Sequence, residues 1–135
     1  MNGIVKEKAI FSLNPAADYS TKLGYFVLVS AGTATITTSA STHPFGVILD
    51  GGVGSSDKIS VGACAGGGSL GTVRAKLAAS LGGIVVQGTN LIITTAGTLD
   101  YDPGSGARVQ CAQAMEAGVA DEIIEVSLFK PVSLS

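Results

Sequence analysis

The most recognisable ligand-binding pattern in this chain is a glycine-rich run at residues 66–71, which has the spacing G-x-G-x-x-G. Such a loop binds a dinucleotide when a helix begins at its last glycine and an acidic residue follows about twenty positions later. No Asp or Glu occurs between Asp57 and Asp100. A P-loop would need a lysine before its Ser or Thr, but Thr72 directly follows Gly71. We therefore interpret this run as a connecting loop and expect no nucleotide cofactor.

Two aspartates have the spacing of calcium ligands. Asp100 and Asp102 match the first two positions of a calcium loop, but Cys111 occupies the place of the bidentate glutamate, and Gly104 that of a third oxygen ligand. Asp-Pro-Gly at residues 102–104 is typical of a turn. A turn is the interpretation we adopt, with a weak surface cation as the alternative.

One histidine and three glutamates are the remaining candidates for acid–base or metal chemistry. His43 is the only histidine, so any zinc site or Ser/His/Asp triad must include it, and no Gly-x-Ser-x-Gly nucleophile motif accompanies it. The glutamates are Glu116, Glu122 and Glu125. Glu122 and Glu125 lie three positions apart on a predicted strand and so point to opposite faces. We expect no catalytic residues and no metal site.

Neither the cysteines nor the basic residues form a recognisable site. Cys64 and Cys111 form no C-x-x-C pattern, and we interpret them as buried thiols, with a single disulfide as an open alternative. Arg74 and Lys76 are the nearest approach to a basic cluster, in a chain of net charge −2. Nucleic-acid binding would require a basic stripe. We expect no nucleic-acid partner.

The composition indicates that part of the protein surface binds other chains. The chain has 135 residues, of which 46% are hydrophobic and only 13% charged, about half of the ~25% that is usual for soluble domains. Sparsely charged sheets expose edges and apolar patches that invite pairing. We expect a homo-oligomer. A compact monomer covered by Thr and Ser is the alternative.

Two long stretches without charged residues raise the question of a membrane span. Residues 23–49 and 77–99 contain no Lys, Arg, Asp or Glu. Their repeated Gly, Thr and Ser suit a β-sheet better than a helix facing lipid. We expect no membrane partner.

Similar stretches in the two halves of the chain indicate an internal repeat. Residues 32–40 and 88–96 both begin with Gly-Thr and continue as apolar, Thr-rich runs. The similarity extends over residues 24–62 and 82–127. We predict an all-β protein with an N-terminal arm and first strand at residues 1–13, followed by a single duplicated domain at residues 14–135.

The pattern of β-branched residues and turn residues places the strands. We predict them at residues 4–13, 25–29, 34–38, 45–49, 58–63, 73–77, 84–87, 91–95, 109–117 and 123–129. Residues 109–117 contain good helix formers but alternate as a strand does, and we choose a strand. Residues 100–106 are predicted to be a loop, and Pro131 to end the last strand.

The second half resembles small tailed-phage proteins of the head decoration, or capsid cement, family. The matching features are a glycine before the apolar run at residues 84–86, Ala114-Met115-Glu116, then Gly118 and the closing segment at residues 121–128. Gly83 departs from the family, which often has Asp there, and residues 110–112 replace a run that contains glycine. The resemblance implies a compact β-barrel or sandwich that binds the outer surface of an icosahedral shell in the virion, as a trimer, by contacting the major capsid protein. It implies no cofactor.

The N-terminal arm is the expected contact with a neighbouring chain. An extended apolar terminus can add a strand to a neighbouring sheet. The residues that we expect at the capsid or subunit interface are Ile4, Val5, Ile10, Phe11, Leu13 and Phe129. The alternative function is a carbohydrate- or surface-binding β module of an adhesin or tail fibre, although only three Tyr and four Phe are present to stack on sugars.

Overall fold

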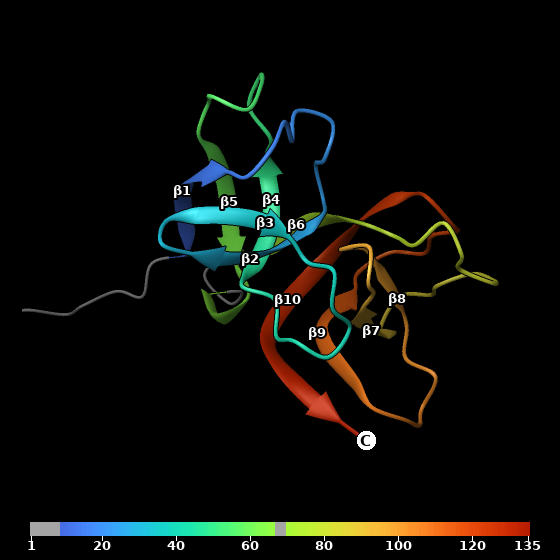
Figure 1. Cartoon of the computed structure of the whole chain (residues 1–135). Helices are drawn as coiled ribbons and strands as arrows, with labels where there is room; N and C mark the ends of the chain where they lie inside the picture. The colour runs from blue at the N-terminus through green and yellow to red at the C-terminus, as the bar shows by residue number, and fades with distance from the viewer. Residues whose placement is uncertain (1–8, 67–69) are drawn as a thin grey trace, which may run out of the picture.

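The regular secondary structure of the described residues is almost entirely β-strand, as the sequence predicts. A computed structural model describes residues 9–66 and 70–135 (Figure 1). The elements in chain order are β1 (Ile10–Pro15), β2 (Phe26–Ser30), β3 (Thr33–Ile36), β4 (Gly46–Asp50), β5 (Ile59–Ala63), the 3₁₀ helix η1 (Cys64–Gly66), β6 (Thr72–Lys76), β7 (Asn90–Ile93), β8 (Leu99–Tyr101), β9 (Arg108–Ala114) and β10 (Ile123–Leu134).

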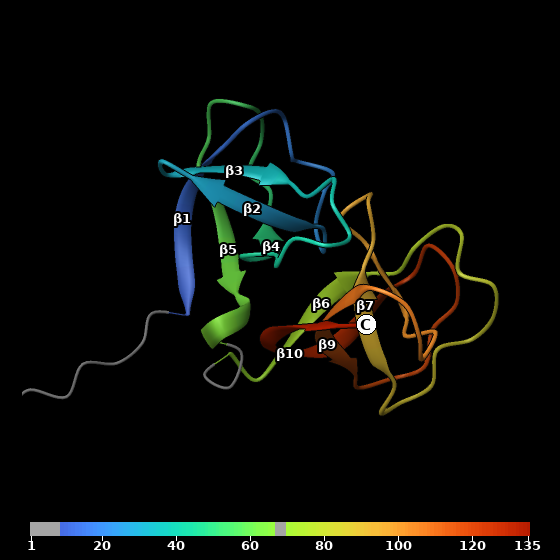
Figure 2. The same ribbon diagram turned by 60° about the horizontal axis from the view of Figure 1, so that its bottom comes forward.

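The first five strands form a closed barrel (Figure 2). Around the ring the order is β1-β3-β2-β4-β5, and β5 returns to β1. Neighbouring strands are antiparallel except for β1 and β3, which run parallel where Asn14 lies beside Thr33 and Pro15 beside Ala34. Closure pairs both edges of most strands, so the barrel needs few charges to protect open edges.

The last five strands form a sheet with the order β6-β10-β9-β7-β8, in which all ladders are antiparallel. A single parallel bridge connects its two ends, from Leu77 directly after β6 to Leu99 in β8. There the amide of Ala78 donates a hydrogen bond to the carbonyl oxygen of Leu99 at 2.8 Å. In the first half, where β1 runs parallel to β3, the amide of Ala16 donates to the carbonyl oxygen of Ala34 at 2.9 Å. The two halves therefore repeat one order of strand pairing, with β6–β10 in the places of β1–β5.

The central hairpins show how the two halves correspond. Ala-Gly-Thr occurs at residues 31–33 between β2 and β3, and again at residues 96–98 between β7 and β8. Gly32 and Gly97 both have φ of 78°, a backbone conformation that glycine adopts without a Cβ clash. Because β1 and β6 also correspond, the repeated unit extends beyond residues 24–62 and 82–127.

The alignment of residues 32–40 with 88–96 is wrong. Thr33–Ile36 is the second strand of its hairpin, whereas Asn90–Ile93 is the first strand of the other hairpin. All four hairpin strands contain Thr or aliphatic residues, so composition alone does not distinguish the first strand of a hairpin from the second.

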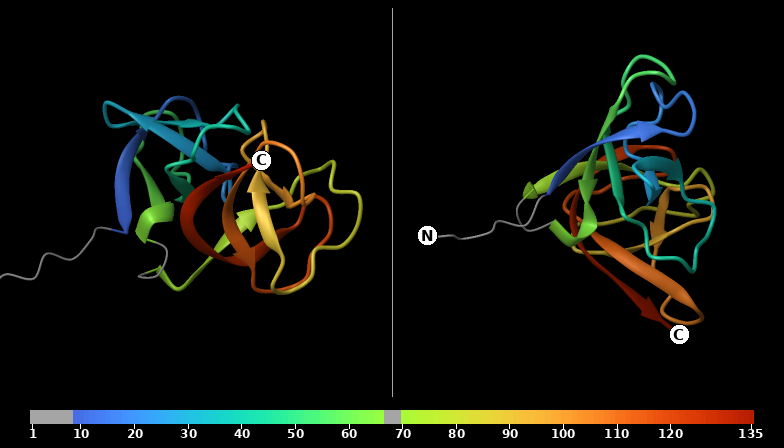
Figure 3. Two further views of the ribbon diagram at one scale, coloured as in Figure 1. Left: turned by 90° about the horizontal axis from the view of Figure 1, so that it is seen from below. Right: turned by 60° about the vertical axis from the view of Figure 1, so that its left-hand side comes forward.

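The two halves of the chain pack side by side (Figure 3). Two apolar clusters form the core, and one of them joins the halves. The smaller cluster lies inside the first barrel and includes Val27, Ile48 and Val61. The larger cluster fills the second half and also contains Phe26 and Val47 from the first half, both fully buried. The larger cluster therefore joins the two halves, while the smaller cluster stays within the first barrel.

Glycines let the two halves approach closely at this junction. The amide of Lys76 donates to the carbonyl oxygen of Gly24 at 3.0 Å, and the amide of Phe26 donates to that of Gly97 at 2.8 Å. A Cβ added at Gly24 would lie 2.8 Å from the nitrogen of Lys76, and one added at Gly97 would lie 2.7 Å from Cγ2 of Ile36. Both positions require glycine for steric reasons.

Three local predictions need correction. Residues 84–87 do not form a strand, and only Val85 makes an isolated bridge, to Gly118. The predicted loop at residues 100–106 contains part of β8. Pro131 does not end the last strand, because β10 pairs with β9 on both sides of a register shift between Leu128 and Val132. A proline is tolerated there since the shift leaves its position without a ladder hydrogen bond.

Candidate interaction surface

The side chains that could do chemistry are dispersed in the fold. His43 lies on the surface, where its Nε2 is 2.7 Å from the hydroxyl oxygen of Ser133. Part of the glycine-rich run, residues 67–69, lies outside the described residues. Among residues 9–66 and 70–135 we find no pocket, and no group of three or more His, Cys, Asp or Glu side chains placed to hold a metal ion.

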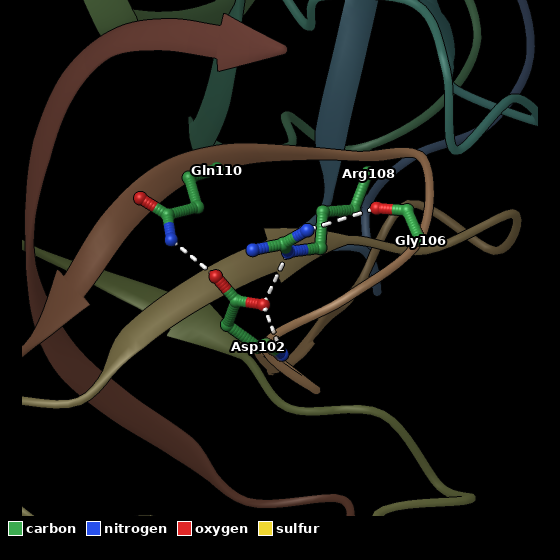
Figure 4. Close-up of polar contacts among 5 residues, drawn as sticks. Asp102, Gly106, Arg108 and Gln110 are labelled. Atoms are coloured by element: carbon green, nitrogen blue, oxygen red, sulfur yellow. Dashed lines mark hydrogen bonds and ion pairs between the residues drawn. The ribbon is translucent and has the colours of Figure 1, made fainter. Parts of the chain in front are cut away.

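Asp102 organises the loop between β8 and β9 (Figure 4). Its carboxylate accepts hydrogen bonds from the amide of Gly104 at 2.8 Å and from the side chains of Arg108 and Gln110. Arg108 also donates to the carbonyl oxygen of Gly106 at 2.9 Å. The side chains of Asp102 and Arg108 are only 13% and 11% exposed. The carboxylate that suggested a cation site is therefore already occupied by donors from its own loop.

The pKa of Asp102 reflects these partners. Partial burial by itself would raise the pKa of this carboxyl group, since a charge is less stable away from water. The hydrogen bonds from Gly104, Gln110 and Arg108, together with the positive charge of Arg108, outweigh burial and lower the pKa below 3.8. Asp102 is consequently held in its ionised form. Sequence reasoning singled out Asp102 but missed Arg108 and Gln110, which lie six and eight residues further along the chain.

The three glutamate carboxylates accept hydrogen bonds from within the chain: two from backbone amides and one from a hydroxyl group. Oε2 of Glu116 accepts a hydrogen bond from the amide of Glu125 at 2.7 Å, and Oε1 of Glu122 accepts one from the amide of Val119 at 2.8 Å. Oε2 of Glu125 accepts one from the hydroxyl group of Thr72 at 3.0 Å. Each of the three carboxylates accepts its hydrogen bond from a different group.

The basic side chains of β6 fasten the start of β10. Arg74 donates to the carbonyl oxygen of Ile123 at 3.2 Å. Lys76 donates to the carbonyl oxygen of Asp121 at 2.6 Å and lies 3.6 Å from its carboxylate. Both cationic side chains therefore bind backbone carbonyl groups at the surface of the sheet.

Cys64 and Cys111 are both free and buried. Burial raises the pKa of the Cys64 thiol to about 12. The pKa of Cys111 is also well above its usual value, because of burial and then of its proximity to Cys64. Both thiols are therefore protonated at neutral pH and act as small apolar groups of the core.

The structure places the six expected interface residues in different environments. Ile10 is exposed, while Phe11 is partly buried, with its ring 5.1 Å from that of Phe45. Phe129 is partly buried. Leu13 is buried in the core of the first barrel, so its assignment to an interface is wrong. Ile4 and Val5 lie outside the described residues.

β1 is a strand of the barrel, so the predicted arm is shorter than residues 4–13. Residues 10–13 pair with β5, from Ile10 beside Gly62 to Leu13 beside Ile59. Ala9 also accepts a hydrogen bond from the amide of Ala63 at 2.8 Å. Residues 9–13 of the predicted arm therefore belong to the barrel, and residues 4–8 lie outside the described residues.

Sequence reasoning missed an apolar surface formed by two adjacent segments. Val85 and Gly118 form an antiparallel bridge, with hydrogen bonds of 2.8 and 2.9 Å. Ile84, Val86 and Val119, next to this bridge, are 68%, 58% and 44% exposed. The sequence signal was the apolar run Ile84-Val85-Val86 between glycines, which we interpreted as part of a strand.

Comparison with known proteins does not assign this chain to a family. A scan against protein-family models finds no match, and a search of curated proteins finds no significant match. In the parts of the chain that the structure describes, no helix is long and apolar enough to cross a membrane.

Proposed function

We propose that this chain is a phage virion structural protein that binds the outer surface of the capsid as a homotrimer and stabilises the shell. Its partner in this proposal is the major capsid protein, and it acts through contact surfaces, without a catalytic site, cofactor or nucleic-acid partner. The observation that carries the proposal is the exposed apolar surface beside the Val85–Gly118 bridge, a contact surface for the homotrimer, on a scaffold whose charged residues mostly bind its own backbone.

The fold suits this role. Two halves with one order of strand pairing are joined by a common apolar cluster, which holds the surface segments on one scaffold. Many copies on a symmetric shell can each bind weakly and still reinforce it, because the contacts are repeated. The resemblance to head decoration proteins points in the same direction.

The test is binding to purified shells. Shells built from the major capsid protein of the same genome are mixed with this protein, pelleted, and compared with shells alone in thermal disruption. We expect saturable co-sedimentation and a higher disruption temperature. Shells that bind none of the protein, at concentrations where it is folded, would refute the proposal.

The second candidate is a carbohydrate- or surface-binding module of an adhesin or tail fibre. One observation favours keeping it: the ring of Tyr101, on the edge strand β8, is 42% exposed and could stack on a sugar. The other Tyr and Phe side chains are buried or partly buried. Binding to a glycan array that is lost in Tyr101→Ala would favour this candidate over the first.

A further inference from the structure

The two segments around the Val85–Gly118 bridge present one apolar face to solvent. Val85 and Gly118 exchange both backbone hydrogen bonds and are buried. In an antiparallel pair, the residues on either side of such a pair lie opposite each other and point to the other face. Ile84 and Val86 flank Val85, and Ala117 and Val119 flank Gly118. We call these four exposed residues the apolar ribbon face.

Acidic side chains border the apolar ribbon face. Glu116 and Glu122 are exposed, and neither forms an ion pair within the described residues. Asp121 is 66% exposed at its side chain, and Lys76 lies beside it. Two such faces in direct contact would bring carboxylates together, which disfavours a face-to-face dimer. The charges favour a partner that brings aliphatic and basic residues.

The chain itself contains a segment of that chemistry. Residues 4–8 read Ile-Val-Lys-Glu-Lys, two aliphatic residues followed by two lysines around one glutamate. They precede Ala9, where the described chain begins. An extended segment of eight residues spans at most about 29 Å.

The position of Ala9 indicates that the partner is another copy. β1 begins on the left of the molecule in Figure 1, whereas the segments that carry the apolar ribbon face lie on the right. A compact chain of this length has a radius of gyration of about 14 Å and is roughly 37 Å across. Residues 1–8 are therefore too short to extend across their own subunit to this face.

We propose that residues 4–8 of one copy bind the apolar ribbon face of a second copy. Ile4 and Val5 cover Ile84 and Val119, and Lys6 and Lys8 lie near Glu116 and Glu122. The contact is heterologous, because it joins residues 4–8 of one copy to a different surface of the next copy. Repetition of such a contact forms a ring if the rotation closes, and otherwise an open chain. The contact does not depend on binding to a capsid.

Cross-linking between two differently labelled copies tests the contact directly. Val5→Cys is made in one preparation and Val119→Cys in the other, while Cys64 and Cys111 stay buried and protonated. On mixing and mild oxidation, we expect a disulfide-linked heterodimer. The control partner is Val53→Cys, at a valine that is 87% exposed in the first half. Equal yields with both partners, or cross-linking of Val5→Cys only to itself, would overturn the proposal.

Solution mass against protein concentration provides a second test. We expect the unchanged protein to associate, and deletion of residues 2–8 or Ile84→Asp to abolish association. Lys6→Glu combined with Lys8→Glu should weaken it about tenfold, and Val53→Asp should leave it unchanged. Circular dichroism checks that each variant is folded. A monomer at all concentrations, or association that survives the deletion, would overturn the proposal.

Binding to shells separates this contact from the proposed function. If cross-links form but shells do not bind the protein, the contact between copies stands and the proposed function fails. If Val119→Asp keeps the mass of the assembly and loses only shell binding, the apolar ribbon face binds the capsid and the proposal of an arm contact fails.

Discussion

The carboxylate of Asp102 acts as a hub for its loop. It accepts hydrogen bonds from the backbone amide of Gly104 and from the side chains of Arg108 and Gln110, so these three groups depend on one charge. Charge-assisted hydrogen bonds of this kind are stronger than neutral ones. Asp100, by contrast, accepts a hydrogen bond from the adjacent amide of Tyr101.

Asp102→Asn should lower the free energy of unfolding by about 2 kcal/mol, since the replacement loses the charge that Arg108 and Gln110 share. Urea unfolding followed by circular dichroism measures the change. Asp100→Asn is the matched control and should cost less than half as much. Equal costs for the two variants would show that the network around Asp102 adds no stability.

The contribution of Asp102 should depend on pH in a defined direction. Its pKa in the folded protein lies below the ordinary value of 3.8, so its stabilisation is present above that value and is lost as the pH falls through the folded-state pKa. The stability difference between the unchanged protein and Asp102→Asn should therefore be constant near neutral pH and shrink below about pH 4. A difference that grows on acidification would contradict this assignment.

The two thiols should be unreactive in the folded protein. Because burial raises the pKa of Cys64 to about 12 and also raises that of Cys111, little thiolate is present for reaction at pH 8. Ellman's reagent should label neither cysteine in the native protein and both in urea. Rapid labelling of one cysteine without urea would reveal local opening of the junction between the halves.

Two glycines with the same backbone angle provide a test of the junction between hairpins. Gly32 and Gly97 both have φ of 78°, but an added Cβ meets nothing within 4 Å at Gly32 and lies 2.7 Å from Ile36 at Gly97. Gly32→Ala should cost about 1 kcal/mol, from backbone strain alone. Gly97→Ala should cost about 3 kcal/mol, because a steric clash adds to that strain. Thermal and urea unfolding measure both, and equal costs would count against the close approach.

The sequence located most strands because their signal is local. Thr-rich and aliphatic runs between glycines predicted β2, β4, β5, β7, β9 and β10, and alternation correctly assigned residues 109–117 mostly to a strand. The short strand β8 was missed because Asp100 and the following Asp-Pro-Gly have strong turn propensity. Residues 84–87 were assigned to a strand wrongly, since apolar runs are also found on exposed surfaces that bind partners.

The shared core predicts that the two halves unfold together. Phe26 is fully buried and packs in the cluster that fills the second half, although it belongs to β2. Phe26→Ala should lower the free energy of unfolding by about 3–5 kcal/mol and should weaken hydrogen-exchange protection in β1–β5 and β6–β10 alike. Val53→Ala, on the surface, is the control. Loss of protection confined to β1–β5 would mean that the halves are independent units.

The candidate surface could be predicted only in part. From the low charge we expected some face of the protein to associate, and we expected the N-terminal segment to take part. The sequence did not reveal that Leu13 is buried in a core, or that Ile84 and Val119 both lie next to the Val85–Gly118 bridge, because each fact depends on pairing between residues far apart in the chain.

The sequence alone determined that this protein is built of strands and is poor in charged residues, and its Thr-rich runs led us to expect related halves. These properties follow from residue types and short-range patterns. Only the tertiary structure decided which Thr-rich strand corresponds to which, which apolar residues are buried, and where the exposed ones gather. A strand alternates with a period of two and accepts several registers, so these choices are made by packing between the halves.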